Sequence, residues 1–341
     1  MTNPEKPVLL DVNGLTVSFA TDRGMVSAVR DVSFNVREGE ILSIVGESGS
    51  GKSVTLLSLL GLHDRKTTRV DGMVAFRGRR MLELAANDLR RIRGKEIGLI
   101  SQDPMTALTP VYTIGWQIAE QIRAHEPVSA RVARKRAIEL LGEVGLSNPG
   151  EAVDRYPHQL SGGMRQRAVI AMALSCNPAL LVADEPTTAL DVTVQAQVLD
   201  LLLRLRKDFG SAIILVTHDM GVVSEIADRV AVMYAGRIVE RGETEAMFAS
   251  PLHPYSWGLM ASIPPLTGAR LNRLNSIPGM PPTPETIGEG CGFAPRCAFA
   301  QPQCLQRPPL RHSGEQAALC VLEEPERGLL RQSVLTPEEF A

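Results

Sequence analysis

The sequence predicts an α/β fold in which short buried strands lead into polar or glycine-rich segments. Three apolar runs carry this prediction: EILSIV at residues 40–45, LLVA at 180–183 and SAIILVT at 211–217. Each has the length and the aliphatic, β-branched composition of a strand buried inside a sheet. In open sheets of this kind ligands bind at the carboxyl ends of the strands, so the residues that follow these runs are the first candidates for a site.

The segments around these strands predict three further parts. Residues 8–19 and 26–36 alternate between apolar and polar side chains, which is typical of antiparallel strands. From Gln102 to Ser175 the pattern becomes helical, with apolar positions at helical spacing in residues 114–124 and 130–144. Residues 192–207 are expected to form another helix, which has a leucine-rich face.

The first strand runs into a loop with the pattern of a phosphate-binding site. Residues 46–53 read Gly-Glu-Ser-Gly-Ser-Gly-Lys-Ser, which fits G-x-x-x-x-G-K-[ST], and a helix is expected from about Lys52 to Leu60. The glycines let the backbone wrap an anion with its N–H groups, and the helix N-terminus adds a partial positive charge. Lys52 is expected to reach the β- and γ-phosphates and Ser53 to bind Mg²⁺. The predicted nucleotide contacts are Gly46, Glu47, Ser48, Gly49, Ser50, Gly51, Lys52, Ser53 and Val54.

The other two strands end in groups that can act on a nucleotide. Asp184 and Glu185 follow the second strand, where carboxylates are costly unless they are paired or close to a metal. Asp184 is expected to hold Mg²⁺, directly or through water, and Glu185 to orient and activate the attacking water. His218 follows the third strand and can hydrogen-bond a γ-phosphate or that water.

These motifs, in this order, resemble those of the ATP-binding cassette (ABC) ATPases over about residues 7–250. Leu160-Ser161-Gly162-Gly163-Met164 resembles the family signature, Gln102 the Q-loop glutamine, and Ala189-Leu190-Asp191 the D-loop. The resemblance implies that Glu185, His218 and Gln102 are catalytic, and that Ser53, Gln102 and Asp184 bind Mg²⁺. It also implies that Ser161, Gly162, Gly163 and Met164 contact the ATP of a second subunit, while Ser161 caps the following helix. Phe19 resembles the aromatic residue that stacks on adenine, but it fits a core-facing strand residue equally well.

A narrower resemblance is to the importer ATPases for di- and oligopeptides and nickel. It is carried by Ser101-Gln102-Asp103-Pro104-Met105-Thr106, by the segment from Tyr156 to Arg167, by Asp184 to Gln197, and by Pro251-Leu252-His253-Pro254-Tyr255. One departure is Ala107-Leu108-Thr109-Pro110, where that group usually has Ser-Leu-Asn-Pro; it lies beside the expected membrane-subunit contact. The implied fold is a P-loop NTPase core with an antiparallel β subdomain, a helical signature subdomain and an irregular C-terminal extension.

The implied function is ATP hydrolysis that energises the import of di- or oligopeptides. An importer of this kind needs two membrane permease subunits, an external binding protein and a second ABC ATPase, which we expect to be a different homologue rather than an identical copy. Import of nickel or another small solute is the alternative within this group. A soluble ABC ATPase acting on nucleic acid or ribosomes, and an exporter subunit, are the rival classes; the single nucleotide domain, the lack of a long coiled-coil insertion and the C-terminal extension argue against them.

Composition agrees with an ATPase that works beside separate membrane subunits. The net charge of the 341 residues is −2, which does not indicate nucleic acid as a partner. The basic run from Arg77 to Lys95 is interpreted as a solvated hairpin and helix face. The N-terminus has no signal-peptide pattern, and no window reaches ~18 consecutive apolar residues. We therefore expect a peripheral location on the cytoplasmic face of the membrane.

The composition changes beyond about Pro254, so we expect an ATP-binding domain at residues 1–254, with its helical subdomain at about 103–175, and an extension at 255–341. Residues 263–309 are rich in proline, which predicts an irregular segment. Four of the five cysteines lie in or close to this segment, at Cys291, Cys297, Cys304 and Cys320, with spacings that match neither a zinc ribbon nor the ferredoxin run. Free thiols, zinc and an iron–sulfur cluster all remain open. The resemblance to peptide-importer ATPases favours a [4Fe–4S] cluster.

Overall fold

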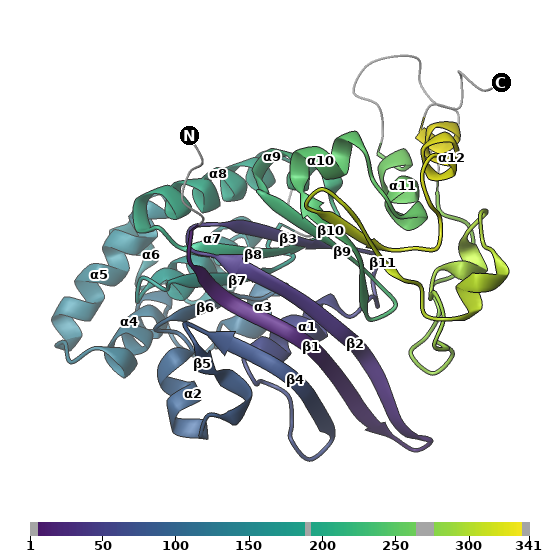
Figure 1. Ribbon diagram of the computed structural model, residues 1–341. Helices are drawn as coiled ribbons and strands as arrows, with labels where there is room; N and C mark the ends of the chain where they lie inside the picture. Colours follow the sequence, from purple (N-terminus) through teal and green to yellow (C-terminus); the bar gives the residue numbers. More distant parts are fainter. Residues whose placement is uncertain (1–5, 188–191, 264–275, 336–341) are drawn as a thin grey trace. The chain divides into compact units, whose positions relative to one another are not determined.

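The computed structural model describes residues 6–187, 192–263 and 276–335 (Figure 1). The chain divides into two compact units, each made of several stretches of sequence. The first comprises Met1–Asp11, Asn35–Ile41 and Ala75–Val216, and the second comprises Val12–Phe34, Leu42–Val74 and Thr217–Ala341. No helix in the described ranges is long and apolar enough to cross a membrane.

Parallel strands form the core of the first unit. Strand β7 (Leu180–Asp184) pairs on one side with β6 (Ile97–Ile100) and on the other with β8 (Ala212–Thr217). The β7 residues 180–183 and the whole of β8 are buried, as expected for near-continuous apolar strands. Both strands agree with the sequence prediction to within one residue. The helix α8 (Val192–Phe209) lies between them in the chain.

The helical part of the first unit covers the segment where helices were expected. It contains α3 (Pro104–Ala107), α4 (Ile114–His125), α5 (Ala130–Glu143), α6 (Pro149–Ala152) and α7 (Gly162–Leu174). Thr113, Ser129 and Ser161 cap α4, α5 and α7, because each side chain accepts a hydrogen bond from a backbone N–H of the first turn. Helix α5 packs on both α4 and α7. The short elements β5 (Arg79–Arg80), η1 (Met81–Glu83) and α2 (Ala86–Ile92) precede β6.

The second unit is built around β3 (Ile41–Val45), all of whose residues are buried. It pairs in parallel with β9 (Arg229–Tyr234), which pairs antiparallel with β10 (Arg237–Glu243). Helix α1 (Lys52–Leu59) follows β3, and α9 (Met220–Ile226), α10 (Thr244–Ala249) and α11 (Pro254–Ala261) complete the helices before residue 263.

The strands expected near the N-terminus are present and slightly longer than predicted. They are β1 (Val8–Thr21) and β2 (Gly24–Arg37), joined by a two-residue turn. In their sheet β1 lies between β2 and β4 (Thr68–Phe76), and β4 pairs antiparallel with β5.

The C-terminal extension is irregular only in part. Its described residues 276–309 contain two short 3₁₀ turns, η3 (Ala294–Arg296) and η4 (Pro302–Leu305). A hairpin of β11 (Leu310–Ser313) and β12 (Gln316–Leu319) follows, and β12 pairs antiparallel with β10. Helix α12 (Glu326–Leu335) then packs on α11. The proline content thus predicted the irregular part, whereas the hairpin depends on a pairing partner about 75 residues earlier in the chain.

Candidate functional site

The loop between β3 and α1 has the backbone that the glycine pattern predicts. Gly46 has φ +152°, and a Cβ there would lie 2.1 Å from the carbonyl oxygen of Met233. Gly51 has φ +102°, and a Cβ there would lie 2.8 Å from the carbonyl oxygen of Ala28. Any side chain at either position would therefore collide with backbone, so both glycines are required by close approach as well as by conformation.

Lys52 is held inside this loop. The side chain belongs to a residue only 5% exposed, and its Nζ donates to the carbonyl oxygens of Gly46 at 2.7 Å and Glu47 at 2.9 Å. The same Nζ lies 3.4 Å from Ser50 Oγ. The ammonium group thus faces the concave side of a loop whose helix begins at Lys52 itself, and this arrangement attracts phosphate. Ser53, the predicted Mg²⁺ ligand, is exposed on the first turn of α1.

Glu47 connects the same loop to the C-terminal extension. Its backbone N–H donates to Tyr255 Oη at 2.8 Å, and its carboxylate forms a two-point ion pair with Arg296 at 2.5 and 3.1 Å. Tyr255 lies in α11 and Arg296 ends η3. The sequence motifs assigned Glu47 to the nucleotide loop but gave no sign of these two partners, which are 208 and 249 residues away.

The first unit holds the acidic residues. Asp184 ends β7 opposite Val216 of β8, and the Glu185 N–H donates to the Val216 carbonyl oxygen at 2.9 Å. Glu185 has φ +47°, a left-handed conformation that is unusual for a non-glycine residue and is often found at functional sites. Gln102 Nε2 donates to Glu185 Oε2 at 3.2 Å. The structure therefore brings together two residues for which the sequence predicted catalytic roles.

The signature residues open helix α7. Ser161 caps the helix by accepting a hydrogen bond from the Met164 N–H at 3.4 Å, as predicted. Gly162 is exposed, and a Cβ there would meet no atom within 4 Å. A cavity of about 420 Å³ adjoins this helix end and is lined by residues that include Ser161, Gly163 and Met164.

A contact that the sequence did not indicate joins α7 to the end of β7. Gln166 is 2% exposed, and its Nε2 donates to the carbonyl oxygen of Pro186 at 2.7 Å. Pro186 follows Glu185 directly, so the signature helix is bonded to the backbone beside that carboxylate.

The remaining predicted residues lie in the second unit or outside the described ranges. His218 is exposed directly after β8, and the next residue, Asp219, caps α9. Phe19 is half-buried on β1, with its ring edge-to-face with His63 at 5.5 Å. Asp191, the predicted D-loop residue, lies outside the described residues.

Comparison with known proteins decides the family. The profile of the ABC transporter family matches residues 29–188, and that of the oligopeptide/dipeptide transporter C-terminal region matches residues 239–304. A putative peptide import ATP-binding protein of Brucella abortus is 51% identical over 313 residues, which cover 92% of this chain and 94% of the relative. The chain belongs to the ABC transporter ATP-binding family. A probable peptide ABC transporter ATP-binding protein of Sinorhizobium fredii is 49% identical over 91% of this chain and 92% of its own.

Solved structures agree with this assignment. A dimeric ATP-binding cassette in a post-hydrolysis state, bound to ADP and Pi, has a TM-score of 0.63 and 30% sequence identity, covering 69% of this ABC ATPase and 98% of that chain. A cassette from Clostridium perfringens, part of an ABC transporter complex, has a TM-score of 0.61 and 26% identity over 72% of this chain and 92% of its own. An ABC ATPase binds ATP with Mg²⁺.

The four C-terminal cysteines of this ABC ATPase line one apolar cavity. Cys291, Cys297, Cys304 and Cys320 share it with aromatic and aliphatic side chains that include Phe293, Phe299 and Leu322. Burial raises the pKa of Cys297 and of Cys320 to about 11, and the neighbouring cysteines add to both shifts. Among the described residues no group of three or more His, Cys, Asp or Glu side chains has a geometry that would hold a single metal ion.

A backbone N–H group is directed at the sulfur atom of Cys304. The N–H of Gln301 donates to Cys304 Sγ at 3.4 Å. Hydrogen bonds of this kind stabilise thiolates that are bound to iron. The donor set is therefore four thiols around one apolar cavity, with one N–H group directed at the sulfur atom of Cys304.

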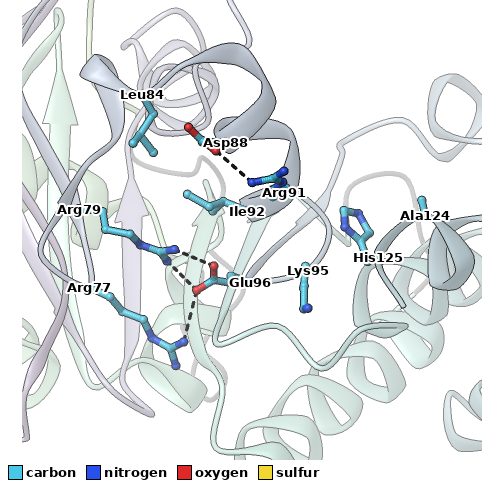
Figure 2. A pocket seen from close by; sticks show the side chains of 10 residues that line it. All are labelled: Arg77, Arg79, Leu84, Asp88, Arg91, Ile92, Lys95, Glu96, Ala124 and His125. Carbon is cyan, nitrogen blue, oxygen red and sulfur yellow. Dashed lines mark hydrogen bonds and ion pairs between the residues drawn. The ribbon is translucent and has the colours of Figure 1, made fainter. Parts of the chain in front are cut away.

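The basic run before β6 lines a different cavity, of about 810 Å³ (Figure 2). Most of its cations are paired: Glu96 bonds both Arg77 and Arg79, and Asp88 bonds Arg91. The Arg79 hydrogen bond is the main cause that lowers the pKa of Glu96. The three arginines and Asp88 are between 41% and 82% exposed and Glu96 is 24% exposed, in agreement with the predicted solvated hairpin and helix face.

Proposed function

We propose that this chain is the ATP-hydrolysing subunit of a membrane importer for di- or oligopeptides. The observation that carries the proposal is the combination, in one chain, of the ABC transporter region with the oligopeptide/dipeptide transporter C-terminal region. Relatives that share about half of its residues over almost their whole length are named as a peptide import ATP-binding protein and a peptide ABC transporter ATP-binding protein. We place the ATP-binding domain at residues 1–254 and the importer-type extension at 255–341.

The site residues then have distinct roles. The loop from Gly46 to Val54 binds the phosphates of ATP, with Lys52 on the β- and γ-phosphates, and Phe19 stacks on adenine. Mg²⁺ is held by Ser53, Gln102 and Asp184, and when bound it neutralises charge on the phosphates. Glu185 takes a proton from the attacking water and His218 hydrogen-bonds the γ-phosphate. The hydrogen bond from Gln102 to the Glu185 carboxylate supports a catalytic role for Gln102.

The complex contains a second ABC ATPase, two permease subunits and an external binding protein. Residues Ser161 to Met164 contact the ATP held by the second ATPase, and Asp191 takes part in the same interface. The exposed N-terminal end of α7, with Gly162 open to solvent, supports this assignment. The subunit works on the cytoplasmic face of the membrane, where it binds the permeases peripherally.

A cluster of exposed apolar side chains follows Gln102 and suits a permease contact. Met105, Val111, Tyr112 and Trp116 are between 43% and 70% exposed, and the rings of Tyr112 and Trp116 stack at 3.9 Å. Grouped apolar and aromatic side chains on a surface are typical of a protein interface. We place the cytoplasmic helix of a permease on this cluster.

Cys291, Cys297, Cys304 and Cys320 are proposed to hold a [4Fe–4S] cluster. The shared apolar cavity and the Gln301 N–H directed at the Cys304 sulfur atom support this proposal. When bound, the cluster supplies a redox-active, negatively charged centre that crosslinks four points of the extension.

Purification of the complex in detergent tests the function. We expect two permeases and a second ATPase to accompany this chain, and peptide uptake into vesicles to require ATP and a binding protein.

The double variant Tyr112→Ser with Trp116→Ser tests the permease contact. It should lower permease recovery about tenfold and leave ATP binding unchanged. Val132→Ser, also a change at an exposed apolar residue, is the matched control. Co-purification of ribosomes or DNA in place of membrane subunits would refute the importer proposal. Uptake of nickel but not of peptides would identify nickel as the transported solute.

A further inference from the structure

Arg296 makes an unusually complete set of contacts for an arginine in an extension. Its Nε donates to the carbonyl oxygen of Pro278 at 2.9 Å, and its two terminal nitrogens donate to Ile277 O and Tyr234 Oη, both at 3.2 Å, as well as to the Glu47 carboxylate. All five N–H groups of the guanidinium are thereby used. The side chain is only 4% exposed. Such a group cannot move without breaking several bonds, so it fixes whatever it holds.

Arg296 holds Glu47, the second residue of the phosphate loop. Glu47 is fixed at three points: its N–H by Tyr255, its carbonyl oxygen by Lys52, and its carboxylate by Arg296. The first and third of these partners come from residues beyond 250. The conformation of the loop between Gly46 and Lys52 is therefore supported from outside the loop by the C-terminal part of the chain.

Charge gives this contact a consequence for ATP. A carboxylate in a loop that wraps a triphosphate repels the ligand unless it is neutralised, and the partly buried position of Glu47, 26% exposed, weakens screening by water. The bidentate guanidinium neutralises the carboxylate and holds it in one orientation.

We propose that Arg296 is a positioning residue for ATP binding, which holds Glu47 and cancels its charge beside the phosphates. The inference rests on the proposed ATP site and assigns to the extension a part in nucleotide affinity. It requires no metal or cluster at the cysteines.

The test measures the dissociation constant of MgATP for the full-length chain. Arg296→Gln should raise it about tenfold at low salt, equivalent to about 1.4 kcal/mol, because Glu47 is left unpaired. Arg296→Lys, which keeps the positive charge, should stay within about threefold of the wild type. Adding Glu47→Gln to Arg296→Gln should recover most of the tenfold loss, because no unpaired carboxylate then remains. Between about 0.1 and about 1 M salt the penalty of Arg296→Gln should shrink to below threefold. In the assembled complex the same variant should raise KM and leave kcat nearly unchanged.

Arg307→Gln is the matched control, since Arg307 also lies in the extension and pairs with a carboxylate, Asp31, away from the loop. Arg296→Met serves the same test if the glutamine variant does not fold. Wild-type affinity in a folded Arg296→Gln protein, or equal weakening in the single and double variants, would overturn the inference. A wild-type chain that binds no ATP would instead overturn the proposed function.

Discussion

The amide of Gln102 donates to the carboxylate of Glu185 across 3.2 Å, between two residues that follow neighbouring parallel strands. Gln102 comes two residues after β6 ends and Glu185 directly after β7. Because the carboxyl ends of parallel strands meet at one edge of a sheet, residues 83 positions apart become direct partners. Any displacement of the segment after β6 must therefore change the surroundings of Glu185.

Glu185→Gln should stop ATP hydrolysis and preserve ATP binding. The amide keeps the size and the hydrogen-bonding oxygen of the carboxylate but cannot accept a proton, so turnover should fall by about 10² or more. Single-turnover hydrolysis and equilibrium nucleotide binding measure the two effects, and trapping of a closed dimer is expected. Full ATP turnover by this variant would remove Glu185 from the proposed role.

Gly46→Ala should abolish ATP binding, and Gly49→Ala should not. A Cβ at Gly46 would lie 2.1 Å from Met233 O, whereas a Cβ at Gly49 meets nothing within 4 Å, although its φ of +79° still costs about 1 kcal/mol. Both are glycines of the same loop with positive φ, so the pair separates collision from conformational strain. Isothermal calorimetry measures ATP binding by each variant. Equal losses of ATP affinity in the two variants would contradict the importance of the collision at Gly46.

Gln166→Leu should destabilise the chain by about 1–3 kcal/mol, because the buried Pro186 carbonyl loses its side-chain donor. ATP turnover should also fall, since Pro186 follows Glu185. Denaturant unfolding and steady-state hydrolysis are the two readouts, with the exposed Gln303→Leu as the control. An unchanged free energy of unfolding would show that the hydrogen bond from Gln166 to Pro186 does not stabilise the fold.

Cys304→Ser should remove iron and the broad visible absorption from anaerobically purified protein. Cys304 is buried against the cavity that it shares with the other three cysteines, so one lost ligand opens the donor set. Cys176→Ser should change neither quantity, since Cys176 is a buried cysteine at the end of α7 that does not line this cavity. A colourless, iron-free wild type would refute the cluster and leave the importer proposal standing.

Glu240 should make stability depend on pH. Burial raises the pKa of its carboxyl from 4.5 to about 7, despite hydrogen bonds from the N–H groups of Leu252 and His253. The folded state therefore binds an extra proton between about pH 4.5 and 7, so the contribution of Glu240 to stability decreases by about 3 kcal/mol as pH rises through that window.

The difference in unfolding free energy between wild type and Glu240→Gln isolates this effect. His253, whose pKa is lowered to about 3 by burial, is present in both proteins and cancels. The wild type should lose stability relative to the variant from pH 4.5 to pH 8. Glu245→Gln, a surface change in the same region, should show no such trend, and a flat difference for Glu240→Gln would contradict the shifted pKa.

Local patterns sufficed for much of the fold. The strands before Gly46 and Asp184 could be predicted because buried strands have a recognisable composition, and Ser161 could be predicted as a cap because capping depends on the next three residues. The phosphate loop needed only eight consecutive positions.

Contacts between distant segments could not be found in this way. The Arg296–Glu47 pair joins residues 249 positions apart, and neither local sequence differs from that of an arginine or glutamate on a surface. The same holds for Gln166 with Pro186 and for the pairing of β12 with β10. Sequence spacing located the four cysteines, but only the fold shows that they share one cavity.

The pairing of β12 with β10 gives the extension a protective role. Without residues beyond about 254, the N–H and C=O groups along the outer side of β10 would form an uncovered strand edge, which is a template for aggregation. Forms shortened to the nucleotide-binding region would expose this edge for a reason unrelated to catalysis. A shortened form that keeps the hairpin keeps this edge paired.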